Sequence, residues 1–245
     1  MDHKVNEFNN PGFIEDDPIG IPHRYSRKED IEIAGFLVAV ISWGNRKTIV
    51  QSGRRMMDLL GNSPYEFVMN HHKSDLKKLE GFVHRTFNGN DFIHLIRSLK
   101  YLYETKGGIE AIFFEHSTPD SLQPAIHHFK KMIYSSPHPA RTTKHVPDPF
   151  QGSAAKRINM YLRWMVRRDK KGVDFGIWPT ISPHILSCPL DLHSGNTARK
   201  LELLTRKQND AKAVTELDQR LRQLDMEDPV KYDFALFGLG IFEGF

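Results

Sequence analysis

A carboxylate at the start of a helix is the first group in this chain whose position could support chemistry. Asp191 stands in the segment PLDLHSG, between an apolar run and the basic stretch NTARKLELLTRK. Aspartate is among the best N-cap residues, because its side chain accepts backbone N–H bonds that the first helical turn leaves unpaired. The local sequence therefore predicts that Asp191 caps a helix running to about residue 205. A cap needs no further role, so the rest of the chain decides whether this carboxylate also acts on a substrate.

A lysine at the start of an earlier helix is the second candidate. The segment QGSAAKR places Lys156 four residues after Gly152, and the sequence predicts a loop there, followed by a helix that begins near Lys156. A lysine amine becomes a nucleophile once it loses its proton, and desolvation favours that loss. On the alternative interpretation, Lys156 lies on a basic helix and contacts only phosphate or solvent.

The elements that must position these residues are helices separated by short breakers. Apolar residues recur at helical spacing and no segment shows a convincing alternating pattern, so the sequence predicts an all-α fold. The segment 27–42 becomes almost wholly apolar after its first turn, as expected of a buried central helix. Residues 136–151 contain four prolines, which predicts an irregular segment. The predicted helices cover 27–42, 47–61, 63–72, 91–108, 108–117, 122–135, 153–168, 191–205, 212–224 and 229–242.

The composition is that of a folded protein and excludes several kinds of site. Of the 245 residues, 39% are hydrophobic and 26% are charged, so the chain can bury a substantial core. Cys188 is the single cysteine, which excludes a disulfide framework, a cysteine-ligated iron–sulfur cluster and a cysteine-based zinc site. No apolar run is long enough to span a membrane and the first residues do not resemble a signal peptide, so we expect a cytoplasmic protein.

The charge pattern is compatible with a nucleic-acid partner. The formal net charge is +4, and a basic protein gains affinity for DNA because neutralised phosphates release counterions. Many helical proteins carry basic faces only as solvated surface, so charge alone does not decide. The pairs His71–His72 and His127–His128 have no acidic partner at metal-binding spacing, and adjacent histidines on a helix point apart. We therefore expect them at the surface, and we expect no metal and no cofactor.

The two candidate segments together resemble the helix-hairpin-helix DNA glycosylases, such as endonuclease III, the adenine glycosylase and the 8-oxoguanine glycosylases. In that family a hairpin of the form L-P-G-x-G-x-K precedes a buried helix, and a (V/I)-D-x-H motif with an essential aspartate follows. QGSAAKR matches the hairpin at Gly152 and Lys156, and PLDLH matches the second motif at Asp191 and His193. The likeness covers about residues 30 to 241.

The chain departs from the family pattern at two positions. Ala154 stands where the second hairpin glycine is usual, which loosens the approach of the backbone to a phosphate. Asn196 stands where the family often has an arginine, five residues after the aspartate. The motifs RWMVR and YDFALFGLG resemble still more closely a bacterial family of unknown function.

The resemblance implies a monomeric base-excision DNA glycosylase with AP-lyase activity, acting on a damaged base in duplex DNA. Asp191 would stabilise the positive charge that develops on the deoxyribose, and Lys156 would attack C1′ to form a Schiff base. The backbone and side chains implied to contact DNA belong to Gly152, Arg157, Asn45, Arg46 and Lys47. The candidate walls for a flipped base are Trp43, Trp164 and Trp178, which are otherwise core residues, and His193 would support the helix start.

The resemblance also implies a two-lobed helical architecture. Residues 1–30 would form an N-terminal arm that packs on the C-terminal lobe. Residues 31–188 would form a helical barrel lobe that includes the hairpin near 150–157, and residues 189–245 would form the C-terminal lobe.

Two other functions stay open. A non-catalytic member of the same fold would bind DNA or RNA by shape and phosphate, and would not need Lys156 and Asp191 to face one another. A metal-dependent phosphohydrolase would need histidine and carboxylate clusters that converge in space. The damaged base is not identified by the sequence, because base recognition depends on a pocket assembled from distant helices.

Overall fold

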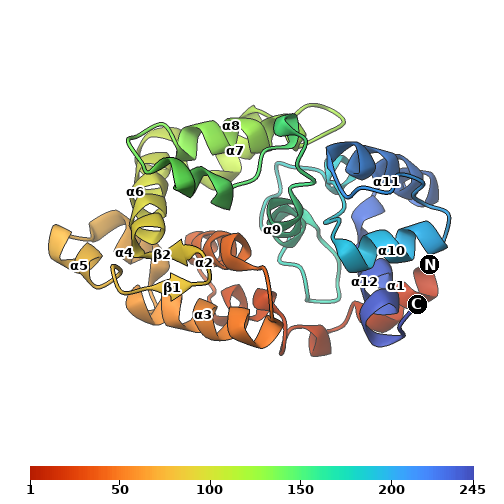
Figure 1. The fold of residues 1–245 in the computed structure, drawn as a ribbon, viewed down its shortest axis with the longest axis horizontal. Helices are drawn as coiled ribbons and strands as arrows, with labels where there is room; N and C mark the ends of the chain where they lie inside the picture. Colours follow the sequence, from red (N-terminus) through yellow and green to blue (C-terminus); the bar gives the residue numbers. More distant parts are fainter. The chain divides into compact units, whose positions relative to one another are not determined.

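The computed structural model describes residues 1–245 and is mostly helical, which confirms the predicted helical character (Figure 1). None of its helices combines the length and the apolar composition needed to cross a membrane. The helices are α1 (Asp2–Phe8), α2 (Lys28–Ile41), α3 (Arg46–Leu59), α4 (Pro64–Asn70), α5 (Lys73–Lys77), α6 (Gly89–Lys106), α7 (Ile109–Glu115), α8 (Gln123–Ile133), α9 (Lys156–Val166), α10 (Leu192–Lys200), α11 (Ala211–Leu224) and α12 (Tyr232–Phe242).

A small hairpin departs from the all-helical expectation. Strands β1 (Val83–His84) and β2 (Phe87–Asn88) form a two-stranded antiparallel sheet. Arg85 lies in the connecting turn with φ of +54°, the left-handed conformation that such tight turns require. Strands of two residues are too short to show an alternating pattern, which is why the sequence does not reveal them.

Contacts divide the chain into two compact units. Unit 1 comprises Met1–Phe13, His116–His127 and Pro147–Phe245, and unit 2 comprises Ile14–Glu115 and His128–Val146. The segment that carries residues 150–157 and α9 therefore clusters with the C-terminal helices. The family resemblance instead implied that it belongs with residues 31–188.

The core of unit 2 is built around α2. Every residue of α2 from Ile31 to Ile41 is buried, which confirms the prediction of a central buried helix. Phe36 on this helix packs edge-on against Phe129, with ring centroids 5.3 Å apart. A helix that is apolar on all sides is stable only when other elements cover it completely.

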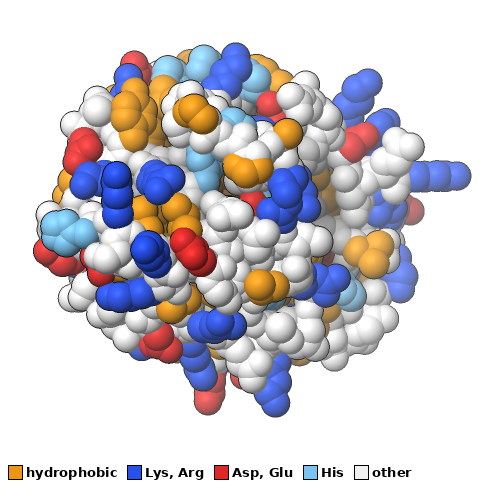
Figure 2. Space-filling view, turned by 60° about the vertical axis from the view of Figure 1, so that its left-hand side comes forward, with side chains coloured by type: hydrophobic (Ala, Val, Ile, Leu, Met, Phe, Trp, Pro, Cys, Tyr) orange, Lys and Arg blue, Asp and Glu red, His pale blue; other side chains and the backbone are white.

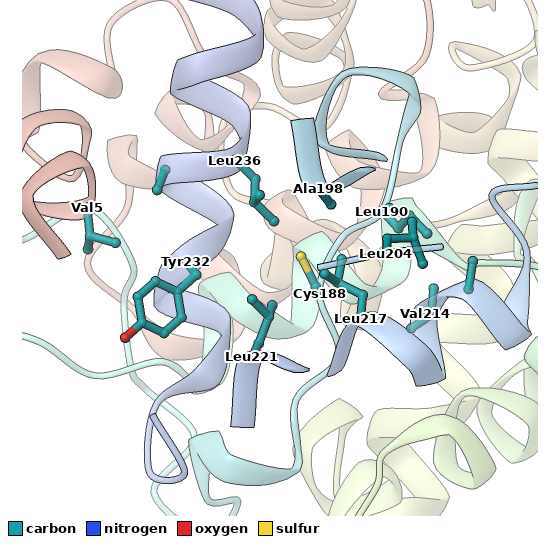
Figure 3. Packing of buried hydrophobic residues seen from close by; sticks show 12 residues of the cluster. Val5, Cys188, Leu190, Ala198, Leu204, Val214, Leu217, Leu221, Tyr232 and Leu236 are labelled. Atoms are coloured by element: carbon teal, nitrogen blue, oxygen red, sulfur yellow. The ribbon is translucent and has the colours of Figure 1, made fainter. Parts of the chain in front are cut away.

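The core of unit 1 lies between α1, α10, α11 and α12 (Figure 3). Leu217 on α11 and Leu236 on α12 are fully buried in this cluster, and Cys188 is buried among them. Leu190 is also buried there and directly precedes Asp191. Core packing therefore fixes the backbone at the point where α10 begins.

Buried ion pairs tie α9 to the C-terminal part of unit 1. Arg163 bonds to Asp174 and Asp233, and Arg167 bonds to Asp174 and Asp228. Both arginines are almost fully buried, at 3% and 2% exposure. Buried charges of this kind are stable only when they are paired. These pairs join the RWMVR motif to the aspartate of YDFALFGLG and explain why α9 belongs to unit 1.

The helix that Asp191 caps is shorter than predicted. α10 ends at Lys200 rather than near residue 205. Glu202 takes a left-handed conformation with φ of +58°, and the Leu203 N–H bonds back to the Ala198 carbonyl at 2.8 Å. This is the hydrogen-bond pattern of a Schellman ending, which usually has glycine at the left-handed position. Because a glutamate stands there, the usual stop signal is absent from the sequence.

We expect Asp218 on α11 to make stability fall as the pH rises. Burial raises the pKa of its carboxyl to about 6, although the carboxylate accepts the Cys188 N–H at 2.9 Å. An aspartate in the unfolded chain titrates near a pKa of about 4, so between about pH 4 and about pH 6 the unfolded chain releases a proton that the folded chain retains. The stability from this group is complete below the unfolded pKa and is lost as the pH rises through the folded pKa.

Denaturant unfolding of the wild type and of Asp218→Asn across this pH range measures the effect. Asparagine can still accept the Cys188 N–H but does not titrate, so the wild type should lose stability relative to the variant as the pH rises. Parallel pH profiles for the two proteins would contradict the assignment.

Candidate active site

The segment before α9 is a tight turn with two left-handed residues. A 3-10 turn over Pro149–Gln151, capped by Asp148, ends at Gly152, which has φ of +85°. Glycine adopts this conformation without steric cost, and a Cβ at Gly152 would meet no atom within 4 Å. Ala155 has φ of +47°, and α9 begins at the next residue, Lys156, as predicted. The Cα of Gly152 is therefore open to an incoming group, whereas its N–H donates to the Pro149 carbonyl at 2.9 Å.

Asp191 caps α10, which confirms the N-cap prediction. Its Oδ1 accepts the backbone N–H groups of His193 at 2.9 Å and Ser194 at 3.1 Å. The Ser194 hydroxyl reciprocates by accepting the Asp191 N–H at 2.9 Å, which completes a capping box. The side chain of Asp191 is therefore held in one orientation by the helix that it starts.

The structure brings Lys156 and Asp191 together. Lys156 Nζ lies 3.7 Å from Asp191 Oδ2, and the amine also donates to the sulfur of Met160 at 3.5 Å. The lysine side chain is 30% exposed and the aspartate side chain is 26% exposed, so a bound molecule can reach both. One carboxylate oxygen holds the helix and the other faces the amine.

This arrangement has a defined chemical capacity. A fixed carboxylate can stabilise a positive charge that develops beside it, and a neighbouring amine can act as a nucleophile after losing its proton. The Asp191 oxygen that faces Lys156 does not take part in the capping bonds to the backbone. The pair can therefore act on a substrate without unwinding α10.

A loop between α10 and α11 connects the two segments that carry the pair. The Asn209 side chain donates to the Asp191 carbonyl at 2.7 Å, and the Ala211 N–H donates to the Gly152 carbonyl at 3.0 Å. Residues 209–211 are therefore bonded both to the start of α10 and to the turn before α9. The local sequence around Asn209 gives no indication of this role, because the bond joins residues that are 18 positions apart.

A buried carboxylate on α12 interacts with the pair electrostatically. Asp233 is 6% exposed and accepts a hydrogen bond from Arg163. Burial raises the pKa of Asp233, the Arg163 and Lys156 charges lower it, and the Asp191 charge raises it. Burial also raises the pKa of the Cys188 thiol well above its usual value, and its sulfur lies 3.9 Å from Asp233 Oδ1. The thiol is therefore protonated and does not serve as a nucleophile.

The other candidate residues of unit 1 occupy different environments. Arg157 is half-buried at the start of α9, and His193 is exposed on the first turn of α10. Trp164 and Trp178 are buried at 0% and 1% exposure, so they are core residues and offer no open face to a flipped base. This outcome matches the alternative that the sequence left open for these tryptophans.

The remaining candidates lie in unit 2. Trp43 is half-buried, and its ring meets that of His84 edge-on with centroids 5.2 Å apart. Asn45 caps α3 by accepting the backbone N–H of Thr48 at 3.3 Å. Arg46 and Lys47 form the first turn of that helix. Trp43 and Asn45 therefore have local structural roles in unit 2, and Arg46 and Lys47 lie at the start of α3.

Basic side chains on α3 line a surface cavity of about 570 Å³. The lining residues are Glu15, Asp16, Arg46, Lys47, Val50, Gln51 and Arg54. Two carboxylates therefore offset part of the positive charge. The space-filling view in Figure 2 likewise shows lysine and arginine side chains interspersed with acidic and apolar ones rather than gathered in one block.

His127 was assigned wrongly from the sequence. It is half-buried, and its Nδ1 lies 3.0 Å from both carboxylate oxygens of Asp148. The expectation of a surface histidine without an acidic partner therefore fails. The partner is 21 residues away and belongs to the proline-rich segment, where no periodic pattern predicts a contact.

The structure contains no group of three or more histidine, cysteine, aspartate or glutamate residues that could hold a metal ion. The phosphohydrolase alternative requires such a group, so the geometry gives it no support.

Comparison with known proteins places the chain in a family without an assigned activity. No curated protein and no solved structure matches the chain. A family model described as a protein of unknown function, DUF2400, matches residues 17–242. This match includes both segments of the Lys156–Asp191 pair and the arginine–aspartate network. The chain belongs to the DUF2400 family.

Proposed function

We propose that this chain is a DNA glycosylase with AP-lyase activity that removes a damaged base from duplex DNA. The observation that carries the proposal is the 3.7 Å contact between Lys156 Nζ and Asp191 Oδ2, on two accessible side chains. An exposed ion pair adds little stability, so stabilisation is a weak reason for this arrangement. A carboxylate locked beside an amine matches what cleavage of an N-glycosidic bond requires.

The proposed reaction begins with nucleophilic attack on the sugar. Lys156 first releases a proton to solvent, and its neutral amine then forms a bond to C1′ while the bond from C1′ to the base breaks. The base leaves with the bonding electrons and takes a proton from solvent. Asp191 Oδ2 stabilises the positive charge on the sugar in the transition state.

The later steps explain strand cleavage. The attack leaves the lysine nitrogen positively charged, and one of its protons passes to O4′ as the C1′–O4′ bond breaks, so the product is a protonated imine between Lys156 and C1′. Loss of a C2′ proton then expels the 3′ phosphate and breaks the strand. Borohydride stops the reaction earlier by delivering hydride to the imine, which leaves a stable covalent adduct.

The surroundings of the pair are suited to a DNA strand. Gly152 is exposed four residues before Lys156, although its N–H already donates to the Pro149 carbonyl at 2.9 Å, and Arg157 follows directly with a positive charge. Arginines are common phosphate contacts and help fix the register of a protein on DNA. Such contacts would hold a phosphate while the base is extruded from the stack.

Lys156→Gln should abolish borohydride trapping. The wild type is incubated with duplexes that each carry an oxidised, deaminated or alkylated base or an abasic site, and covalent adducts are separated by denaturing electrophoresis. We expect at least one duplex to give an adduct with the wild type and none with the variant, because glutamine cannot form an imine. Some base release can remain in the variant if water replaces the amine.

The matched control is Lys212→Gln, which removes an exposed lysine from α11. This control should trap as well as the wild type. An adduct that persists in Lys156→Gln would contradict the assignment of the nucleophile. Wild-type binding to duplexes without base release from any of them would favour the non-catalytic nucleic-acid-binding alternative.

A further inference from the structure

An exposed aromatic ring lies in the turn that precedes Lys156. Phe150 is 61% exposed and belongs to the 3-10 turn that ends at Gly152. Its ring stacks on the ring of His127, with centroids 4.6 Å apart and planes 24° from parallel. The high exposure shows that most of the phenyl side chain remains uncovered.

A single buried carboxylate bonds to the backbone of Phe150 and to the ring of His127. Asp148 is 5% exposed, and its Oδ1 accepts the Phe150 N–H at 3.0 Å. Both of its oxygens also lie 3.0 Å from His127 Nδ1. A lone exposed phenylalanine is ordinary on a protein surface. This ring differs because the backbone that carries it and the ring beneath it are fixed by one side chain.

The position of the ring relates it to the candidate active site. Phe150 precedes Lys156 by six residues, and six residues span at most about 20 Å. In duplex DNA this distance corresponds to about six base pairs at about 3.4 Å each. The Cα atoms of Phe150 and Lys156 are therefore close enough for one bound strand of about that length to contact both residues.

We propose that the exposed face of Phe150 is a stacking platform for an unpaired base of the nucleic acid bound at the Lys156–Asp191 pair. The inference rests on the proposed function, because the pair is what brings the strand to the hairpin. A nucleobase fits this surface because every base has a π-face that stacks on an aromatic ring without requiring a particular sequence. Fixing the ring in advance lowers the entropy lost when the base binds.

The test uses duplexes in which 2-aminopurine lies opposite an abasic analogue, so that the fluorescent base is unpaired. The wild type should quench its fluorescence on binding. Phe150→Leu should weaken binding about 5- to 150-fold and remove the quenching, because it keeps an apolar side chain but loses the ring. Phe150→Trp should retain both, and a fully paired duplex should bind all variants equally well.

The matched control is Phe114→Leu, which replaces another exposed phenylalanine, 55% exposed on α7. This variant should behave as the wild type does. If Phe150→Leu and Phe114→Leu bind and quench equally, the stacking platform is overturned, including the case in which Phe150 instead contacts a protein partner. Failure of the wild type to bind any of these duplexes overturns it as well.

Borohydride trapping, measured in parallel, separates this inference from the proposed function. If the wild type traps a lesion duplex but Phe150→Leu still quenches 2-aminopurine, the result supports the proposed glycosylase activity and contradicts base stacking on Phe150. If no duplex is trapped and no base is excised but Phe150→Leu loses the quenching, the result supports base stacking on Phe150 and contradicts the proposed glycosylase activity.

Discussion

Replacing Asp191 by asparagine should lower base excision by about 100- to 1000-fold or more, the loss typical of removing one preorganised electrostatic partner of a transition state. Asparagine keeps the shape of the side chain and an oxygen that can accept the N–H groups of His193 and Ser194. It removes the negative charge that now faces Lys156 at 3.7 Å. The loss should therefore appear in the rate of base release under single-turnover conditions.

Folding should hardly change in this variant. Asparagine and aspartate are about equally good N-cap residues, so the start of α10 should remain intact. A thermal melt of each protein checks this, and Asp210→Asn serves as a matched control. Asp210 caps α11 by accepting the Ala213 N–H at 3.0 Å and pairs with Arg206, so its replacement removes a capping carboxylate whose cationic partner is Arg206 rather than Lys156. We expect Asp210→Asn to retain base excision.

The opposite result would give Asp191 a purely structural role. If Asp191→Asn unfolds at a markedly lower temperature but excises bases at the wild-type rate per folded molecule, the carboxylate acts only as a cap. Loss of DNA binding in the variant would point to a different fault, because the proposed role concerns the transition state rather than affinity. Binding and rate are therefore measured on the same preparation.

Local signals in the sequence predicted several features correctly. The N-cap at Asp191, the start of α9 at Lys156 and the burial of α2 each depend on residues within one or two helical turns. Capping side chains and apolar periodicity act over that range. These features can be predicted from one sequence because the interactions that determine them lie close together in the chain.

Features that depend on distant partners could not be predicted. Arg163 and Arg167 look like part of a basic helix face, yet both are buried among aspartates, and all of these except Asp169 follow them by 7 to 70 residues. The same holds for His127, whose partner Asp148 is 21 residues away. From sequence alone, a charged residue is expected to be exposed unless the oppositely charged residue that pairs with it is also identified.

The Lys156–Asp191 pair combines a feature set by local sequence with one set by distant partners. The N-cap role of Asp191 follows from local sequence, but its distance from Lys156 depends on packing between α9 and α10. The bonds from Asn209 and Ala211 that support this packing come from a third segment. The two residues were paired in the sequence through a family resemblance, and the structure supplies the measured contact between them.

Arg163→Met should destabilise the protein by about 3–5 kcal/mol, the usual cost of leaving one partner of a buried ion pair unpaired. Arg163 is 3% exposed, bonds to Asp174 and Asp233, and lies 4.3 Å from the centre of the Phe234 ring. Methionine fills much of the same volume but carries no charge. Asp233 then loses the cation that now lowers its pKa, so its charged form becomes more costly to bury.

The loss should also depend on pH. Without Arg163, the folded protein favours protonated Asp233, so the cost of the substitution should be smaller at about pH 5 than at about pH 8. Urea unfolding at both pH values measures this. Arg220→Met, which replaces an exposed arginine on α11, should cost less than about 0.5 kcal/mol at either pH.

A double variant distinguishes the unpaired charge from lost packing. Arg163→Met with Asp233→Leu removes both charges of the pair, and apolar replacement of a buried ion pair is often neutral or stabilising. The double variant should therefore recover most of the stability that Arg163→Met loses, and its stability relative to the wild type should no longer depend on pH in this range. A double variant that is less stable than Arg163→Met would show that α9 depends on packing at Arg163 rather than on its charge.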